Sequence, residues 1–303
     1  MNPHENGVAV VTGATGGMGQ VIALTLARRG MHVVTIARRP QRAEDLRTRI
    51  AQSPGGGSLG VIQGDLSHRA GVIAACAAIR ERHGALRLLI NNAGAHYPDH
   101  RVNPDGIEMH IAVDYLAAYG LTRLLEPELR RGRARVVNVA SDTLRDTRQV
   151  KLSGRPRPAT LDIDQLDDLT TLNPARGFVP FQAYARAKLL TVTSGYALAR
   201  SLAGSVTINA VHPGIVATEI IDDLIPSVLR PFGGVIRRTM LSPDQGAAAA
   251  LRLATDPAIR ETTGRYYVRD SDTITPPISY AADVQNRLLE TTDRFFGLET
   301  PIP

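Results

Sequence analysis

The stretch Gly7-Val-Ala-Val-Val-Thr-Gly-Ala-Thr-Gly-Gly-Met-Gly19 places a short apolar run directly before a glycine-rich turn. The run predicts a buried strand, and the helical spacing of apolar residues from Gln20 to Arg29 predicts a helix after the turn. This order is typical of a dinucleotide site, because glycines let the backbone approach a pyrophosphate and a helix N-terminus favours negative charge. A glycine-rich turn without a ligand is the alternative. The predicted phosphate cradle comprises Gly13, Thr15, Gly17, Met18 and Gly19.

The next apolar run, residues 31–37, predicts a second strand and is followed by Arg38 and Arg39. Folds that prefer NAD usually place a carboxylate at this point to bind the ribose hydroxyls. Two guanidinium groups stand here instead, and such groups suit a 2′-phosphate. We therefore expect NADP(H) to be favoured over NAD(H), with both arginines at the phosphate. The alternative is two solvated arginines at a helix start.

Two further strands are predicted at residues 59–63 and 86–90. Ligands of such sheets bind at the carboxyl ends of the strands, so the residues that follow each strand are candidate cofactor contacts. Asp65 is a candidate acceptor for an adenine amino group, or else belongs to the N-cap region of a helix that starts at Ser67. The candidates after these two strands are Asp65, Leu66, Asn92, Ala93 and Gly94.

A tyrosine and a lysine four residues apart, Tyr184 and Lys188, lie in a run of helix formers. On a helix this spacing puts both side chains on one face. A free phenol titrates near ~10, and a positive charge beside it favours the phenolate, so the pair is a candidate proton donor tuned toward neutral pH. A chance pair on a surface helix is the alternative. The chain has only two lysines, Lys151 and Lys188, which favours the catalytic interpretation.

The composition is that of an ordinary globular protein, with 43% hydrophobic and 21% charged residues. The formal net charge is +6, but the arginines are scattered in pairs without a long basic block, so we expect no nucleic-acid partner. No apolar run reaches the ~18–20 residues that span a bilayer, and the N-terminus lacks a signal-peptide layout. We expect a cytoplasmic protein with no membrane or metal site and with Cys76 as a core thiol. Few lysines and many arginines and alanines indicate a GC-rich bacterial genome.

Four motifs occur in order along the chain: Thr12-Gly13-x3-Gly17-x-Gly19, Asn91-Asn-Ala-Gly94, Ser141 and Tyr184-x3-Lys188. Together they resemble the short-chain dehydrogenase/reductase family, and residues 135–141, 161–164 and 212–219 are similar to its retinol-dehydrogenase-like and protochlorophyllide-reductase-like members. The resemblance implies an α/β fold in which residues 1–303 form a single Rossmann-type domain, a doubly wound parallel sheet with helices on both faces. It also implies NAD(P)(H) and a reversible carbonyl/alcohol reaction.

The same resemblance implies roles for individual residues. Tyr184 is expected to be the acid/base, and Lys188 is expected to lower its pKa and to bind the nicotinamide ribose. Ser141 ends an apolar run and is expected to donate a hydrogen bond to the substrate carbonyl; taken alone, it would be a helix N-cap. A loop after the sixth predicted strand is expected to contact the nicotinamide carboxamide, with the candidates Pro213, Gly214, Ile215 and Thr218.

One position departs from the family pattern. Relatives carry an asparagine in the helix before the Ser141 strand, and the matching residue here is Asp114. The family asparagine supports a water in the proton relay, largely through a distortion of its helix, and we expect the backbone of Asp114 to do the same. In the alternative, a charged Asp114 carboxylate opposes the phenolate of Tyr184 and favours the ammonium of Lys188. Asp114 is therefore a further candidate catalytic residue.

Three segments outside the motifs are expected to shape the site. The long excursion between Ser141 and Tyr184 is either functional or a bare linker. Residues 215–240 are expected to form an apolar lid. A C-terminal extension begins at about residue 271, and its amphipathic helix, residues 281–296, is expected either to close the site or to pack at the surface of a homo-oligomer.

The expected function is that of a ketoreductase or alcohol dehydrogenase that uses NADP(H). Its partner would be a small-molecule carbonyl or alcohol with an apolar framework, of a pathway-specific, secondary-metabolite kind. A non-redox enzyme of the same fold and a nucleotide-sensing regulatory protein are the alternatives. Sensors usually lose the catalytic tyrosine or lysine, so the retention of Ser141, Tyr184 and Lys188 favours an enzyme.

Overall fold

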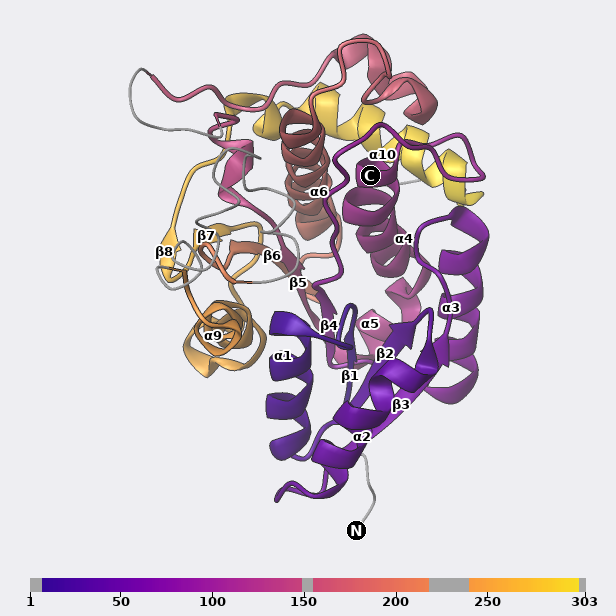
Figure 1. Cartoon of the computed structure of the whole chain (residues 1–303), viewed down its shortest axis with the longest axis vertical. Helices are drawn as coiled ribbons and strands as arrows, with labels where there is room; N and C mark the ends of the chain where they lie inside the picture. The colour runs from indigo at the N-terminus through magenta and orange to yellow at the C-terminus, as the bar shows by residue number, and fades with distance from the viewer. Residues whose placement is uncertain (1–6, 149–154, 218–239, 300–303) are drawn as a thin grey trace.

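An eight-stranded sheet forms the centre of the computed structural model, which describes residues 7–148, 155–217 and 240–299 (Figure 1). Within these residues the strands are parallel except for β8, which pairs antiparallel with β7. In spatial order they are β3 (Ser58–Gln63), β2 (His32–Ala37), β1 (Val8–Val11), β4 (Leu88–Asn91), β5 (Arg135–Val139), β6 (Thr207–His212), β7 (Tyr266–Val268) and β8 (Ser271–Asp272). The predicted α/β fold with a mostly parallel sheet is confirmed.

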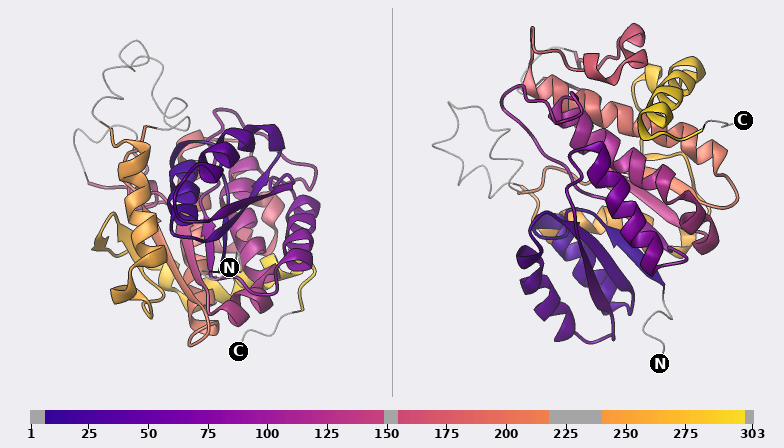
Figure 2. Two further views of the ribbon diagram at one scale, coloured as in Figure 1. Left: turned by 90° about the horizontal axis from the view of Figure 1, so that it is seen from below. Right: turned by 90° about the vertical axis from the view of Figure 1, so that its right-hand side faces the viewer.

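Helices cover both faces of the sheet, which explains why the strand sequences are apolar without alternation (Figure 2). Successive strand side chains point to opposite faces, so Val10 belongs to one core and Val11 to the other. The helices on the Val11 face are α1 (Gly17–Arg28), α2 (Glu44–Ala51) and α9 (Pro243–Thr255). Those on the Val10 face are α3 (Arg69–Arg82), α4 (Ala117–Leu124), α5 (Glu126–Gly132) and α6 (Pro180–Ser201).

The strand order reverses between β1 and β4. From β1 the chain winds outward through β2 to β3, and it then returns to start the second half at β4 on the other side of β1. Connections that leave two adjacent strands in opposite directions open a crevice at their carboxyl ends, where ligands of such sheets bind. The glycine turn after β1 and the segment Asn91–Gly94 meet at this point.

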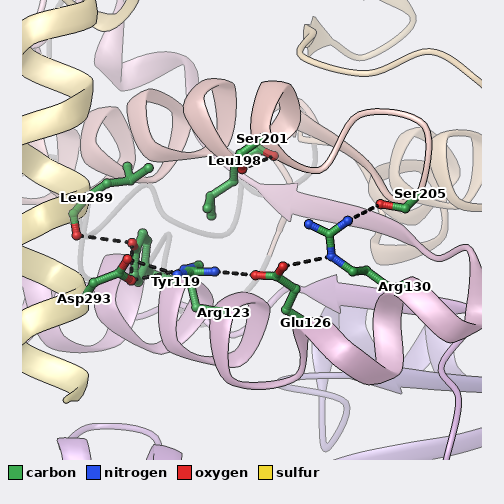
Figure 3. A network of polar contacts seen from close by, with 9 residues as sticks. All are labelled: Tyr119, Arg123, Glu126, Arg130, Leu198, Ser201, Ser205, Leu289 and Asp293. Atoms are coloured by element: carbon green, nitrogen blue, oxygen red, sulfur yellow. Dashed lines mark hydrogen bonds and ion pairs between the residues drawn. The ribbon is translucent and has the colours of Figure 1, made fainter. Parts of the chain in front are cut away.

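The C-terminal helix α10 (Ala282–Phe296) packs on the helical layer of its own chain. Its apolar side chains join the core beside α4 and α6. The fully buried Asp293 accepts hydrogen bonds from the Tyr119 hydroxyl at 2.7 Å and from the Arg123 guanidinium at 3.0 and 3.1 Å (Figure 3). The apolar stripe of this helix is buried inside the chain, and none of its residues lines the cavity described below. A role of the helix at the surface of a homo-oligomer stays a prediction.

The remaining elements refine the predictions. The described part of the excursion before α6 contains three short 3-10 helices, Asp142–Leu144, Ile163–Asp167 and Leu169–Thr171, so it is not a bare linker. β8 was missed, since a two-residue strand carries no periodicity. Most of the predicted lid lies outside the described residues. Cys76 is a buried core thiol, as expected, and burial raises its pKa to about 12. Along the described ranges, no helix has both the length and the apolar character to cross a membrane.

Candidate active site

A cavity of about 920 Å³ lies at the carboxyl ends of β1, β4 and β5. Its wall includes most of the residues nominated from the sequence. The predicted cofactor residues on the wall are Gly13, Thr15, Gly17, Met18, Gly19, Arg38, Asp65, Leu66, Asn92, Ala93, Gly94, Pro213, Gly214 and Ile215. Ser141, Tyr184 and Lys188 line the same cavity. Asp114 lies behind Lys188, and Thr218 is outside the described residues.

The glycine turn needs its glycines for two reasons. Gly13 has a φ of 67° and Gly17 a φ of 53°, in the left-handed region that side chains disfavour. A Cβ on Gly19 would lie 2.2 Å from the carbonyl oxygen of Gly13, so α1 starts too close to the turn for any side chain. The backbone at the start of α1 is therefore open to a ligand, as a phosphate cradle requires.

Thr12 and Asn92 hold the two strand ends together. The Thr12 hydroxyl accepts hydrogen bonds from the N–H groups of Asn92 at 3.0 Å and Ala93 at 2.8 Å. The Asn92 amide returns a bond to the carbonyl of Thr12 at 2.9 Å. Asn92 therefore braces the cradle as well as lining the cavity.

Two of the arginines near the end of β2 line the cavity wall. They are Arg38, which was nominated from the sequence, and Arg42, which was not, whereas Arg39 is not on the wall. A 3-10 helix, Pro40–Ala43, turns the chain directly after Arg39. Asp65 also lies on the wall and accepts the Ser67 N–H at 2.9 Å, while His68 is the residue that caps α3.

The helix α6 carries the tyrosine and the lysine into the cavity. Pro180 sits in its first turn, where the missing N–H has no helical partner to lose. Tyr184 and Lys188 follow on one face, and the Lys188 Nζ lies 5.5 Å from the centroid of the Tyr184 ring. Lys188 also donates a hydrogen bond to the carbonyl of Val139 at 3.1 Å, which ties α6 to the end of β5 beside Ser141.

Asp114 is engaged through both its backbone and its side chain. It lies in a π-helical segment, Ile111–Leu116, so the expected helix distortion is present, and its carbonyl accepts the Thr191 hydroxyl at 2.7 Å. Its carboxylate Oδ1 lies 3.0 Å from Lys188 Nζ, with both side chains buried. A Cβ on Gly94 would come within 2.7 Å of this oxygen, so the ion pair lies directly under the Asn91–Gly94 segment.

Burial and charge act in opposite directions on Tyr184. Burial raises the pKa of its phenol, the Lys188 ammonium and the Ser141 hydroxyl lower it, and the Asp114 carboxylate raises it again. Lys188 therefore lowers the pKa of Tyr184 as predicted, but burial outweighs this effect and the net shift is upward. Burial also opposes the Lys188 ammonium, but the Asp114 carboxylate outweighs this and raises the pKa of Lys188. Burial raises the pKa of Asp114, and the ammonium opposes that rise.

Several wall residues were not predicted. Tyr97 and Phe181 stand beside the proposed catalytic residues, and Arg148 lies on the same wall, held by both oxygens of Asp146 at 2.8 and 2.9 Å. Tyr97 lies three residues beyond the Asn91–Gly94 motif, so the extended chain after the motif was the signal that could have identified it. Among the described residues, no group of three His, Cys, Asp or Glu side chains is placed to hold a metal ion.

Comparisons with known proteins support the same conclusion. A family model described as short chain dehydrogenase matches residues 7–150. The chain is 31% identical over 268 residues to a probable oxidoreductase of Streptomyces antibioticus. This alignment covers 86% of this chain and 83% of that protein. It is 28% identical over 302 residues to mouse retinol dehydrogenase 14, with 95% and 85% covered. The predicted resemblance to the retinol-dehydrogenase-like branch is therefore confirmed.

A solved structure adds a third comparison. A putative NAD(P) dependent gluconate 5-dehydrogenase from Beutenbergia cavernae, with NADP bound at low occupancy, aligns with a TM-score of 0.63 at 26% identity. The alignment covers 87% of this chain and 94% of that one. Fold, motif geometry and relatives agree: the chain belongs to the short-chain dehydrogenase/reductase family, whose members are NAD(P)-dependent oxidoreductases that act on CH–OH groups.

Proposed function

We propose that this chain is an NADP(H)-dependent oxidoreductase that interconverts the carbonyl and alcohol forms of a small apolar molecule. One observation carries the proposal: Ser141, Tyr184 and Lys188 line the same cavity as the glycine turn and the end of β2. A phosphate cradle at one end and a proton donor at the other are the two parts that a nicotinamide-dependent reaction needs.

The residues present fit a nicotinamide dinucleotide. The left-handed glycines Gly13 and Gly17 leave the backbone at the start of α1 exposed to a pyrophosphate. Arg38 and Arg42 are the guanidinium groups that would bind a 2′-phosphate, and this is the basis for preferring NADP(H) over NAD(H). When bound, the nicotinamide ring supplies or accepts the hydride.

The chain's own residues handle the proton. We assign Tyr184 as the group that donates a proton to the carbonyl oxygen in reduction and removes it in oxidation. Ser141 donates a hydrogen bond to the same oxygen. Lys188 holds the charge beside the phenol and would bind the nicotinamide ribose of a bound cofactor, and the Asp114 carboxylate keeps Lys188 charged. The upward pKa shift of Tyr184 keeps its phenol protonated at neutral pH, which suits the reducing direction.

The substrate is assigned only by the chemistry of the wall. Phe181, Val216 and Met240 contribute apolar surface to the cavity wall. Such a wall suits a carbonyl or alcohol carried on an apolar framework. A pathway-specific, secondary-metabolite carbonyl is consistent with it.

The test is cofactor consumption. Oxidation of NADPH and of NADH should be followed by absorbance with ring ketones, quinones and aldehydes of increasing apolar size. We expect turnover with at least one class of apolar carbonyl, at a higher kcat/KM for NADPH than for NADH. Tight NADPH binding without turnover on any carbonyl or alcohol would contradict the enzymatic proposal and favour a sensor. Equal kcat/KM for the two cofactors would contradict the NADP(H) preference alone.

A further inference from the structure

A second group of buried polar side chains adjoins the candidate active site, outside the motifs found in the sequence. Glu108 and His110 are 1% and 0% exposed and lead into the π-helical segment. His110 Nδ1 lies 2.7 Å from Glu108 Oε1. Burial opposes the Glu108 carboxylate, but hydrogen bonds from His110 and Asn173 outweigh it and lower the pKa of Glu108. Glu108 is therefore an anionic acceptor for the Nδ1 proton.

The other ring nitrogen of His110 has the opposite role. The main-chain N–H of Tyr97 donates a hydrogen bond to His110 Nε2 at 3.0 Å. A ring nitrogen that accepts a hydrogen bond carries no proton, so the ring proton is on Nδ1. The two contacts together define one neutral tautomer of His110, with Nδ1 as donor and Nε2 as acceptor.

His110 and Asp114 act on the same stretch of chain. The N–H of Ala95 donates to Asp114 Oδ1 at 3.2 Å, and the N–H of Tyr97 donates to His110. Residues 95 and 97 are two apart in a segment without helical structure, and residues 110 and 114 are about one helical turn apart. Each acceptor on the helix therefore meets one donor on the segment. Ala95 and Tyr97 both line the cavity, so the segment is part of its wall.

The His110 ring also contacts the proposed proton donor. Its centroid lies 6.2 Å from that of the Tyr184 ring, at an interplanar angle of 70°. It lies 5.3 Å from the Tyr97 ring at 80°. Edge-to-face contacts of this kind fix the relative orientation of rings. The His110 ring therefore contacts both Tyr97 on the cavity wall and the phenol ring of Tyr184.

Asn173 connects this group to the start of α6. Its Nδ2 donates to Glu108 Oε2 at 2.8 Å and to the carbonyl of Ala183 at 3.2 Å. Ala183 directly precedes Tyr184 in the helix. The network thus joins the cavity wall, the π-helical segment and the first turns of α6.

We propose that His110 is a positioning residue. Together with Asp114 it holds residues 95–97 in place as part of the cavity wall by accepting their main-chain hydrogen bonds, and it fixes the position of this segment relative to Tyr184. We call this pair of contacts the clamp. The important bond is the one that His110 Nε2 accepts from Tyr97. Glu108 and Asn173 keep the ring in the tautomer that can accept it. The inference rests on the proposed function for its catalytic consequence, but the clamp itself is a property of the folded chain.

Two variants separate the two ends of the imidazole. His110→Gln offers an oxygen at the reach of Nε2, so it can still accept the Tyr97 N–H. His110→Asn is shorter and keeps only a donor toward Glu108. We expect kcat of His110→Gln within about threefold of wild type, and kcat of His110→Asn lower by roughly tenfold to a hundredfold, since a small misplacement of reacting groups has effects of this size. NADPH binding should stay within about twofold in both, because the phosphate cradle is untouched.

Two measurements do not depend on turnover. In the ¹⁵N-histidine-labelled wild-type protein, the ring ¹⁵N shifts of His110, assigned with His110→Gln, should show a proton on Nδ1 only. Hydrogen exchange of the Tyr97 amide should accelerate in His110→Asn and stay slow in His110→Gln. A proton on Nε2, or equal exchange in the two variants, would overturn the clamp, and the wild-type spectrum decides even where His110→Asn does not fold.

The catalytic consequence has its own outcomes. Turnover of His110→Asn within twofold of wild type, or equal losses in the two variants, would overturn the positioning role. If the wild-type protein turns over no carbonyl, the proposed function fails, while the tautomer and the amide exchange still decide whether the clamp exists.

Discussion

The ion pair between Asp114 and Lys188 makes a specific prediction about pH. Asp114→Asn keeps the shape of the side chain, and its amide oxygen can still accept the bonds of Lys188 and Ala95. What it removes is one negative charge, 3.0 Å from the Lys188 ammonium. That carboxylate raises the pKa of Tyr184, so its removal should favour the phenolate.

The size of the effect follows from the geometry. At an effective dielectric constant of ~20, a unit charge at the 5.5 Å that separates Lys188 Nζ from the Tyr184 ring centre contributes about 3 kcal/mol, or about two pH units. The Asp114 carboxylate, 3.0 Å from that ammonium, acts on Tyr184 with the opposite sign, and we take it to cancel roughly half of this contribution. The acidic limb of the pH–rate profile for alcohol oxidation should therefore move down by about one pH unit.

The assay is kcat/KM for oxidation and for reduction across pH, in the wild-type protein and in Asp114→Asn. The alkaline limb of carbonyl reduction should move in the same direction, since reduction needs the protonated phenol. Asp293→Asn is the matched control, because it removes a buried carboxylate that pairs with Arg123 outside the cavity, and it should leave both profiles in place. An unchanged profile in Asp114→Asn would refute the electrostatic role and leave only the backbone role. Complete loss of activity would mean that Asp114 has a chemical role of its own.

Three further changes test other parts of the account. Arg38→Ala and Arg42→Ala should each weaken NADPH binding at least tenfold while NADH binding changes little, and Arg39→Ala should leave the binding of both nucleotides unchanged. Fluorescence titration of both nucleotides measures these affinities, and equal losses for NADPH and NADH would contradict the prediction. Burial lowers the pKa of His96 from 6.5 to about 4. The unfolded chain therefore takes up the proton first as pH falls, and the free energy of unfolding should drop between pH 6.5 and 4 by up to about 3 kcal/mol. His96→Phe should flatten that dependence in denaturant titrations, and an unchanged slope would contradict a buried neutral His96. Asp293→Ala leaves the largely buried Arg123 without its partner on α10, so it should lower the free energy of unfolding by about 3–5 kcal/mol in denaturant titrations. A loss below about 1 kcal/mol would mean that the network in Figure 3 contributes little to folding stability.

The order of sheet and helices could be predicted because its signals are local. Each strand is a short apolar run, and the glycine turn sits directly between one such run and a helix. Ser141 could be placed at the carboxyl edge of the sheet because it follows a predicted parallel strand. Its convergence with Tyr184 and Lys188 was implied by the family resemblance rather than by the strand pattern. The capping box of Ser242 and Gln245 at the start of α9 is a local signal of the same kind.

The features that could not be predicted from the sequence depend on contacts between residues that are far apart in the chain. Arg123 and Asp293 are 170 positions apart, so no periodicity could reveal that α10 docks on α4. The presence of Arg42 on the cavity wall depends on how the 3-10 turn Pro40–Ala43 directs its side chains. The net upward pKa shift of Tyr184 depends on burial, which outweighs a lysine that the spacing did identify.

The central claim, that Tyr184 transfers the proton in a nicotinamide-dependent reaction, is tested most directly by Tyr184→Phe. Tyr196→Phe is the matched control, since Tyr196 is buried on the same helix and its hydroxyl bonds to Thr275 at 3.0 Å, off the cavity wall. The measurement is NADPH affinity together with kcat for the best carbonyl substrate. The account predicts that Tyr184→Phe binds NADPH within about twofold of wild type and loses at least a hundredfold in kcat, while Tyr196→Phe keeps both. Turnover of Tyr184→Phe within a few-fold of wild type would contradict it.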